Sequence, residues 1–273
     1  MGDDLVRKYD LAYMSYPEIA AINKDDALLL IPIGCVEQHG PCGYVGADAI
    51  LAHRVALEAA SALSGVYVTP PIWFGYTPYT AFAGTVSLRQ ETLHALVEDV
   101  VYGYIAHGFR HICIVNNHGP NEAAIEPVAS KVRKERGIVI GILYPWMLAN
   151  HVAVDLYPDS KAVYGHGGEP TISVMMAMSP GSVTLVKPLK RGYVSPEGPL
   201  RVTSFRAARF EGFQIGLYNA PKDVLPSGAS GDWSVATEER GREILKRMIK
   251  YAVDFLPEFL RYSKNSQAQS AGV

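Results

Sequence analysis

The sequence lacks the features that would place the protein in a membrane or on nucleic acid. It contains no run of about 18 or more apolar residues, the length that a transmembrane helix requires. The first residues, Met1 to Asp4, end in two acids and are not followed by the apolar core of a secretory signal. The formal net charge is −2, and no run rich in lysine and arginine is available to follow a phosphate backbone. These absences predict a cytoplasmic protein that binds neither membranes nor nucleic acids.

Cysteine is scarce as well. The three cysteines are Cys35, Cys42 and Cys113, an odd number without a CxxC pair. Neither a disulfide framework nor a thiolate zinc site is indicated by this spacing. We therefore interpret each cysteine as a small buried hydrophobic residue.

The composition is that of an ordinary globular protein. Hydrophobic residues make up 48% and charged residues 19% of the 273 residues, far from the balance of a disordered chain. No repeat or low-complexity linker marks a domain boundary. We expect one domain over residues 1–262, closed by an amphipathic helix at about 237–260, and a flexible tail over residues 263–273.

Buried strands alternate with helices along the first half of the chain. The apolar run at residues 27–33 ends at Gly34 and has the length and flanks of a buried parallel strand. The same reasoning predicts strands at 66–69, 111–115 and 137–143, and helices at 47–63, 90–107 and 122–136. Alternation of this kind predicts a mostly parallel sheet covered by helices on both faces. The fold class is therefore α/β, a three-layer αβα domain, with loops and short strands over residues 180–230.

A polar segment, Glu37-Gln38-His39-Gly40-Pro41, follows the first strand, and Asp48 comes shortly after it at the start of a helix. In open α/β sheets, ligands bind at the carboxyl ends of the strands. Two carboxylates and an imidazole there would suit Zn²⁺ or Mn²⁺. The alternative is that Asp48 only caps its helix and His39 is an ordinary loop residue.

Two further polar segments could join this site. Asn117 and His118 follow the strand at 111–115 just as His39 follows the first strand, although an Asn-His-Gly sequence also suits a simple turn. His166 is flanked by glycines and followed by Glu169, directly before a helical run. An imidazole is the usual general acid or base, whereas Glu169 could simply compensate the dipole of that helix.

Together these motifs resemble the creatininase family of dinuclear amidohydrolases. The resemblance rests on four segments: Glu37 to Pro41 with Asp48, Asn117 to Asn121, Gly84-Thr85-Val86-Ser87-Leu88, and His166 to Glu169. It extends from about residue 27 to Thr237. The resemblance implies a creatininase-like fold, two divalent metal ions per chain, Zn²⁺ and/or Mn²⁺, and a homo-oligomer, which in this family is often a hexamer.

The resemblance also implies a ligand for each ion. Glu37 and His118 would bind one ion, His39 would bind the other, and Asp48 would bridge both. A carbonyl carbon would be attacked by a water or hydroxide between the ions, and His166 would protonate the departing nitrogen.

The last ligand is less well determined by the resemblance. Creatininase itself has a glutamate two residues after the histidine that corresponds to His118, and this chain has Pro120 there. We predict that Glu169 replaces it, with Glu122 as the alternative.

The chain departs from the family pattern around the substrate. A histidine that often follows the Glu37 to Pro41 segment is Cys42 here, and one that often precedes the Gly84 to Leu88 segment is Tyr79. The Glu-Thr pair that often follows the His166 to Glu169 segment is Thr171-Ile172. Creatinine itself is therefore not the expected substrate. The predicted substrate contacts are Tyr79, Trp146, Tyr164 and Asn117, although most aromatic residues of these loops could equally be core or subunit contacts.

Three functions remain open from the sequence. The first is hydrolysis of a C–N bond in a cyclic amide or formamide. The second is hydrolysis of a C–C or ester bond in a cyclic ketone or a sugar-like ring at the same site. The third is a binding protein without activity, which the complete set of candidate ligands argues against.

Overall fold

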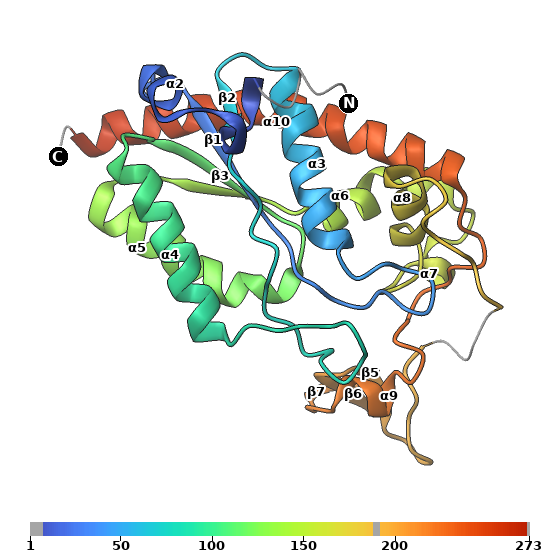
Figure 1. Cartoon of the computed structure of the whole chain (residues 1–273). Coiled ribbons are helices and arrows are strands. Elements are labelled where there is room, and N and C mark those ends of the chain that lie inside the picture. The colour runs from blue at the N-terminus through green and yellow to red at the C-terminus, as the bar shows by residue number, and fades with distance from the viewer. Residues whose placement is uncertain (1–7, 188–191, 272–273) are drawn as a thin grey trace.

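Four parallel strands form the central sheet of this computed structural model, which describes residues 8–187 and 192–271 (Figure 1). Their order in the sheet is β2-β1-β3-β4. The strands are β1 (Leu28–Ile33), β2 (Val66–Val68), β3 (His111–Asn116) and β4 (Ile140–Leu143). The two central strands, β1 and β3, are buried along their whole length, as their continuous apolar runs predict. The predicted α/β class is confirmed.

Helices cover both faces of the sheet (Figure 1). Leu28 and Leu30 belong to one core and Leu29 and Ile31 to the other, because successive side chains of a strand point to opposite faces. The first core lies under α3 (Ala47–Ser61), α6 (Pro145–Val152) and α10 (Glu238–Ala271), and the second under α4 (Gln90–Ala106) and α5 (Glu122–Arg136). The short helix α8 (Thr171–Met178) packs against α10.

The C-terminal helix is longer than the sequence suggests. We expected a flexible tail from residue 263, but α10 continues to Ala271. The buried Ser263 hydroxyl lies 2.9 Å from Nδ1 of His111, and Lys264 forms an ion pair with Asp26. These contacts join this part of α10 to the amino end of the sheet. The single domain over residues 1–262 stays a prediction, and residues 1–7 and 272–273 lie outside the described residues.

A second, antiparallel sheet lies apart from the main body, at the bottom of Figure 1. It consists of β5 (Arg201–Ser204), β6 (Ala207–Phe210) and β7 (Phe213–Gly216), followed by the short α9 (Pro221–Val224). The prediction of loops and short strands in this region agrees with this arrangement. Within the described residues, no helix is both long and apolar enough to span a bilayer.

Smaller elements were not predicted. They are η1 (Leu11–Tyr13), α2 (Tyr16–Ala21), η2 (Gly119–Asn121), α6, η3 (Val154–Leu156), α7 (Ser160–Val163) and α9. Each spans eight residues or fewer, which is too short for a helical period to stand out in a sequence. Of these, α6 matters for the site because it begins beside the carboxyl end of β3.

Candidate metal centre

The predicted ligands meet at the carboxyl edge of the main sheet. Ile33 and Asn116, the last residues of β1 and β3, are direct neighbours in the parallel ladder. The backbone N–H of Asn117 donates to the carbonyl of Ile33 over 2.9 Å, so the loops after the two strands leave the sheet side by side. Asp48 reaches the same place from the first turn of α3.

Asp48 lies at the centre of this group and is fully buried. Its Oδ1 lies 3.2 Å from Nε2 of His39 and accepts a hydrogen bond from Nε1 of Trp146 over 2.6 Å. Its Oδ2 lies 3.1 Å from Nδ1 of His118 and accepts a hydrogen bond from Sγ of Cys35 over 3.0 Å. The two oxygens of one carboxylate thus face two different histidines.

Glu37 is the second buried carboxylate, with only 2% of its surface exposed. Its Oε2 lies 3.6 Å from Nε2 of His118 and accepts a hydrogen bond from the hydroxyl of Thr77. Its Oε1 lies 3.6 Å from Nδ1 of His166. Glu37 therefore connects the loop after β3 with the glycine-rich segment that carries His166.

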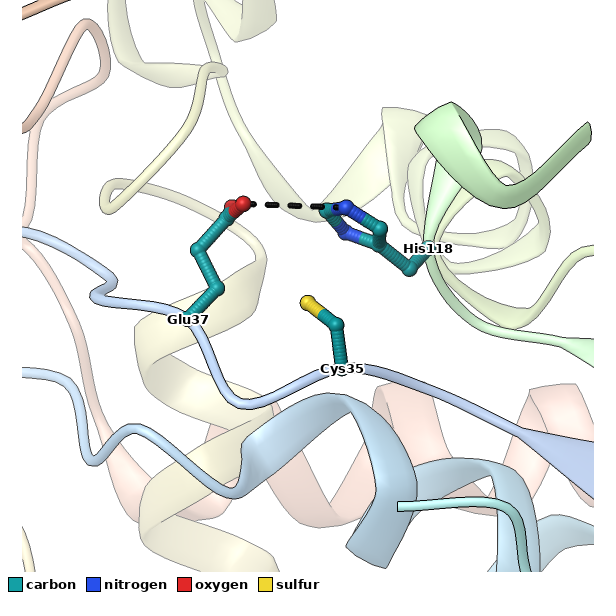
Figure 2. Close-up of side chains that lie close together, drawn as sticks. All are labelled: Cys35, Glu37 and His118. Atoms are coloured by element: carbon teal, nitrogen blue, oxygen red, sulfur yellow. Dashed lines mark ion pairs between the residues drawn. The ribbon is translucent and has the colours of Figure 1, made fainter. Parts of the chain in front are cut away.

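Among the residues that the structure describes, two groups of donor atoms are compact enough to hold a metal ion. One comprises Cys35, Glu37 and His118 (Figure 2), and the other Glu37, His39 and His166; within each group the donors lie within 4.8 Å of one another. Buried carboxylates require a compensating positive charge. Carboxylate, imidazole and thiol donors together suit a borderline divalent cation such as Zn²⁺. The residues present therefore fit a divalent metal.

The charges of this site are balanced between carboxylates and imidazoles. Burial opposes ionisation of Asp48, but the facing His39 and His118 outweigh it and hold the pKa of Asp48 well below its usual range. Burial raises the pKa of Glu37. Burial also disfavours the charged imidazoles, yet the carboxylates raise the pKa of both His39 and His118. A divalent cation would supply positive charge to the same carboxylates.

His166 has a different environment. Its ring is stacked on Tyr79, with centroids 4.6 Å apart and an interplanar angle of 6°, and on His39 at 5.1 Å. Its Nε2 lies 2.9 Å from the backbone carbonyl and 3.0 Å from the side-chain Nε2 of Gln38. Burial, followed by the charge on His39, lowers the pKa of His166 to about 3. The imidazole is therefore neutral at pH 7.

Glu169 and Glu122 lie outside both groups of donors. The buried Glu169 carboxylate accepts one hydrogen bond from the hydroxyl of Tyr157 and another, over 2.8 Å, from Ser173. Glu122 is exposed and accepts a hydrogen bond of 2.9 Å from the hydroxyl of Tyr144. The structure thus brings together Glu37, His39, Asp48, His118 and His166, but neither candidate for the last ligand.

Three of the four residues predicted to contact substrate lie at the centre. Trp146 donates to Asp48, and Tyr79 stacks on His166. Asn117 donates from Nδ2 to the backbone carbonyl of Asp48 over 3.1 Å and accepts from the backbone N–H of Trp146 over 3.0 Å. Tyr164 instead packs edge-on against Tyr157, with centroids 5.3 Å apart.

Sequence reasoning missed three side chains of the site: Cys35, Gln38 and Thr77. Both Thr77 and Gln38 are hydrogen-bonded to the Gly84 to Leu88 segment. The backbone N–H of Thr77 donates to the hydroxyl of Ser87. The backbone N–H of Gln38 donates to the hydroxyl of Thr85. Cys35 had a positional signal, because it also follows β1 at the edge where the ligands gather.

A comparison with known families identifies the group to which this arrangement belongs. The family model for creatininase, described as creatinine amidohydrolase, matches residues 12–256. The chain belongs to the creatininase family. It is therefore a member of a family of hydrolases, as the motifs predicted.

Relatives within the family carry different names. The chain is 27% identical over 255 residues to creatinine amidohydrolase of Pseudomonas putida, a match that covers 88% of this chain and 92% of the relative. It is 26% identical over 255 residues to 3-dehydro-scyllo-inosose hydrolase of Thermotoga maritima, covering 87% and 79%. It is 28% identical over 231 residues to mycofactocin precursor peptide peptidase of Mycobacterium ulcerans, covering 81% of each. Membership of the creatininase family therefore does not select one substrate.

Solved creatininase structures share the fold. A crystal structure of creatinine amidohydrolase has a TM-score of 0.73 at 23% identity, covering 91% of this chain and 96% of that one. A creatininase structure with Mn has a TM-score of 0.72 at 24% identity, and a mutant creatininase of the Zn-Zn type 0.72 at 23%; each match covers 91% of this chain and 97% of the other. The prediction of a creatininase-like fold is confirmed.

Proposed function

We propose that this protein is a dinuclear metal-dependent amidohydrolase that cleaves a C–N bond in a small polar cyclic amide or formamide. One observation carries the proposal: the two oxygens of Asp48 face His39 and His118 at 3.2 and 3.1 Å. A carboxylate that has a separate nitrogen donor beside each oxygen is suited to bridge two cations. Membership of an amidohydrolase family supports the same reaction.

In this proposal Glu37 and His118 would hold one ion, His39 would hold the other, and Asp48 would contribute to both sites. Both oxygens of Glu169 are engaged by Tyr157 and Ser173. Glu169 and Glu122 lie outside both groups of donors, so either side chain would have to move towards the ions to become the fifth ligand. The pair of ions, whether Zn²⁺ or Mn²⁺, remains our proposal for the cofactor.

Bound ions would lower the pKa of a water molecule from 15.7 towards about 7 and polarise a carbonyl group. His166 would then move the proton. In the tautomer that carries its proton on Nε2, the ring donates to the carbonyl of Gln38 and leaves the lone pair of Nδ1 facing Glu37, 3.6 Å away. A neutral imidazole in this position would relay a proton to the departing nitrogen.

Metal analysis tests the centre. Protein purified without chelators is expected to contain about two ions per chain, and chelation should abolish amide hydrolysis until Zn²⁺ or Mn²⁺ is restored. A chain that contains no ion and binds neither metal when titrated would refute the proposal.

A second candidate substrate is a cyclic ketone or sugar-like ring in which a C–C or ester bond is cleaved. Two observations favour it: the similarity to an inosose hydrolase, and the presence of Tyr79 where the family pattern often has a histidine. Tyr79 stacks on His166 and is only 5% exposed, so this difference lies beside the reacting groups. Metal-loaded protein should be assayed in parallel with cyclic amides, inosose-type ketones and lactones. Turnover of amides alone would exclude this candidate.

We also propose that the protein is a homo-oligomer, as the resemblance implied, and that it lies in the cytoplasm, as the sequence predicted. The aromatic side chains of β6 and β7 support an assembly, because Phe210 and Phe213 are 43% and 74% exposed on adjacent strands. Light scattering on purified protein should give a multiple of the chain mass. A monomer at micromolar concentration would contradict this proposal.

A further inference from the structure

We propose that Cys35 is a metal ligand, and that its sulfur makes the site of Glu37 and His118 selective for Zn²⁺ over Mn²⁺. The inference rests on the proposed function, since it requires that an ion be bound there. It assigns a role to a residue that the sequence presented only as a small buried hydrophobe.

The position of Cys35 favours this role. The residue follows β1 by two positions and is completely buried. In Figure 2 its sulfur points towards the side chains of Glu37 and His118. The three donor atoms lie within 4.8 Å of one another, which is close enough for one ion to contact all three.

A fourth donor lies beside them. Oδ2 of Asp48 is 3.0 Å from the sulfur of Cys35 and 3.1 Å from Nδ1 of His118. Oδ2 of Asp48, which accepts the hydrogen bond from the thiol, would therefore face this ion. One thiolate, one imidazole and two carboxylates provide the four donors that a zinc site commonly uses.

Coordination changes the bonding of the sulfur in a defined way. The S–H bond that now points at Asp48 is replaced by a sulfur–metal bond, and the proton is released to solvent. Thiolates are soft ligands that favour Zn²⁺, whereas Mn²⁺ prefers carboxylate and water oxygens. A thiol that merely donated to Asp48 would leave this preference unchanged.

The variant Cys35→Ser separates the two roles, because a serine hydroxyl can still donate to Asp48 but supplies no sulfur. Cys113→Ser is the matched control, since Cys113 is equally buried but lies within β3 and faces the core. Both variants should be checked for native circular dichroism. If Cys35→Ser fails to fold, Cys35→Ala provides the same spectroscopic comparison.

The first measurement is X-ray absorption at the zinc edge of the full-length, zinc-loaded protein. The native chain and Cys113→Ser should show a sulfur neighbour at about 2.3 Å in addition to nitrogen and oxygen at about 2.0–2.2 Å. Cys35→Ser should lose the sulfur and keep the lighter neighbours. Protein loaded with Co²⁺ should show a thiolate-to-metal charge-transfer band that disappears in the same variant.

The second measurement is the ratio of Zn²⁺ to Mn²⁺ affinity, from competition with a chromophoric chelator. Cys35→Ser should lower this ratio by about tenfold or more. Native protein that binds zinc through nitrogen and oxygen alone would overturn the inference while leaving the metal centre in place. An equal loss of affinity for both metals would also overturn it, and failure to bind any metal would refute the proposed function itself.

Discussion

The indole nitrogen of Trp146 lies 2.6 Å from Oδ1 of Asp48, the oxygen that also faces His39. This contact joins the first turn of α6 to the first turn of α3. Outer hydrogen bonds of this kind orient a ligating carboxylate and tune its charge. Trp146, which the sequence suggested as a substrate contact, therefore also holds the proposed bridging ligand.

Replacing Trp146 by phenylalanine should weaken metal binding. Trp146→Phe removes the N–H donor but keeps an aromatic ring, and we expect metal affinity to fall by about 10- to 100-fold. Competition with a chromophoric chelator measures this loss. Trp73→Phe is the control, because Trp73 is 44% exposed. The metal affinity of this variant should stay within about twofold of the native value. An unchanged affinity in Trp146→Phe would contradict the role assigned to the indole.

His166→Ala should retain both ions and lose catalysis. Removing a group that transfers protons is expected to lower kcat by about 10²- to 10⁴-fold while two ions per chain remain bound. Elemental analysis beside steady-state kinetics tests this. Because His166 also lies within reach of Glu37 and His39, loss of one ion would show instead that it is a ligand.

Glu169→Gln tests whether Glu169 is a metal ligand or has a structural role. The hydrogen bonds from Tyr157 and Ser173 favour a structural role. We therefore expect the variant to keep two ions and to lose about 1–3 kcal/mol in free energy of unfolding, since the amide nitrogen that replaces one oxygen cannot accept a hydrogen bond. Metal content and urea denaturation are measured on one preparation. A chain left with a single ion would establish Glu169 as the fifth ligand predicted from the sequence.

Gly34→Ala should disturb the metal centre by displacing the start of α3. A Cβ atom at Gly34 would lie only 2.2 Å from the backbone nitrogen of Ala49, so α3 would have to move away from β1. We expect destabilisation of at least about 1–3 kcal/mol and reduced metal content, because Asp48 moves with the helix. Gly119→Ala is the control, since a Cβ there meets nothing within 4 Å. Native stability in Gly34→Ala would contradict the close approach.

His111 should make stability depend on pH. Burial is the main cause that lowers the pKa of His111 below its ordinary value near 6.5. The unfolded chain therefore binds this proton more readily, so the stability present above about pH 6.5 is lost as the pH falls towards the folded pKa. Urea denaturation between about pH 5 and 7.5 should show a steeper decline for the native chain than for His111→Gln. An equal change of stability with pH in both proteins would exclude His111 as a source of the pH dependence.

The sequence predicted the main sheet closely because its signals are local. The apolar run of β3 and the helical period of α5 lie within single segments, and both were recognised without tertiary information. The extension of α10 to Ala271 was not predicted, because the contacts of this segment involve residues far away in the sequence. Ser263, for example, lies beside His111. A polar helical segment looks like a frayed tail until its partner is known.

For the site, the sequence alone determined which donors lie at the strand ends. Glu37, His39, Asp48 and His118 follow strands or begin a helix, and parallel strands must bring their carboxyl ends to one edge. Only the tertiary structure decided what each donor faces. In the structure, Trp146 and Cys35 donate hydrogen bonds to Asp48. Glu169 instead accepts hydrogen bonds from Tyr157 and Ser173. A hydrogen bond depends on distances of a few ångströms between segments far apart in the chain, and residue order does not contain those distances.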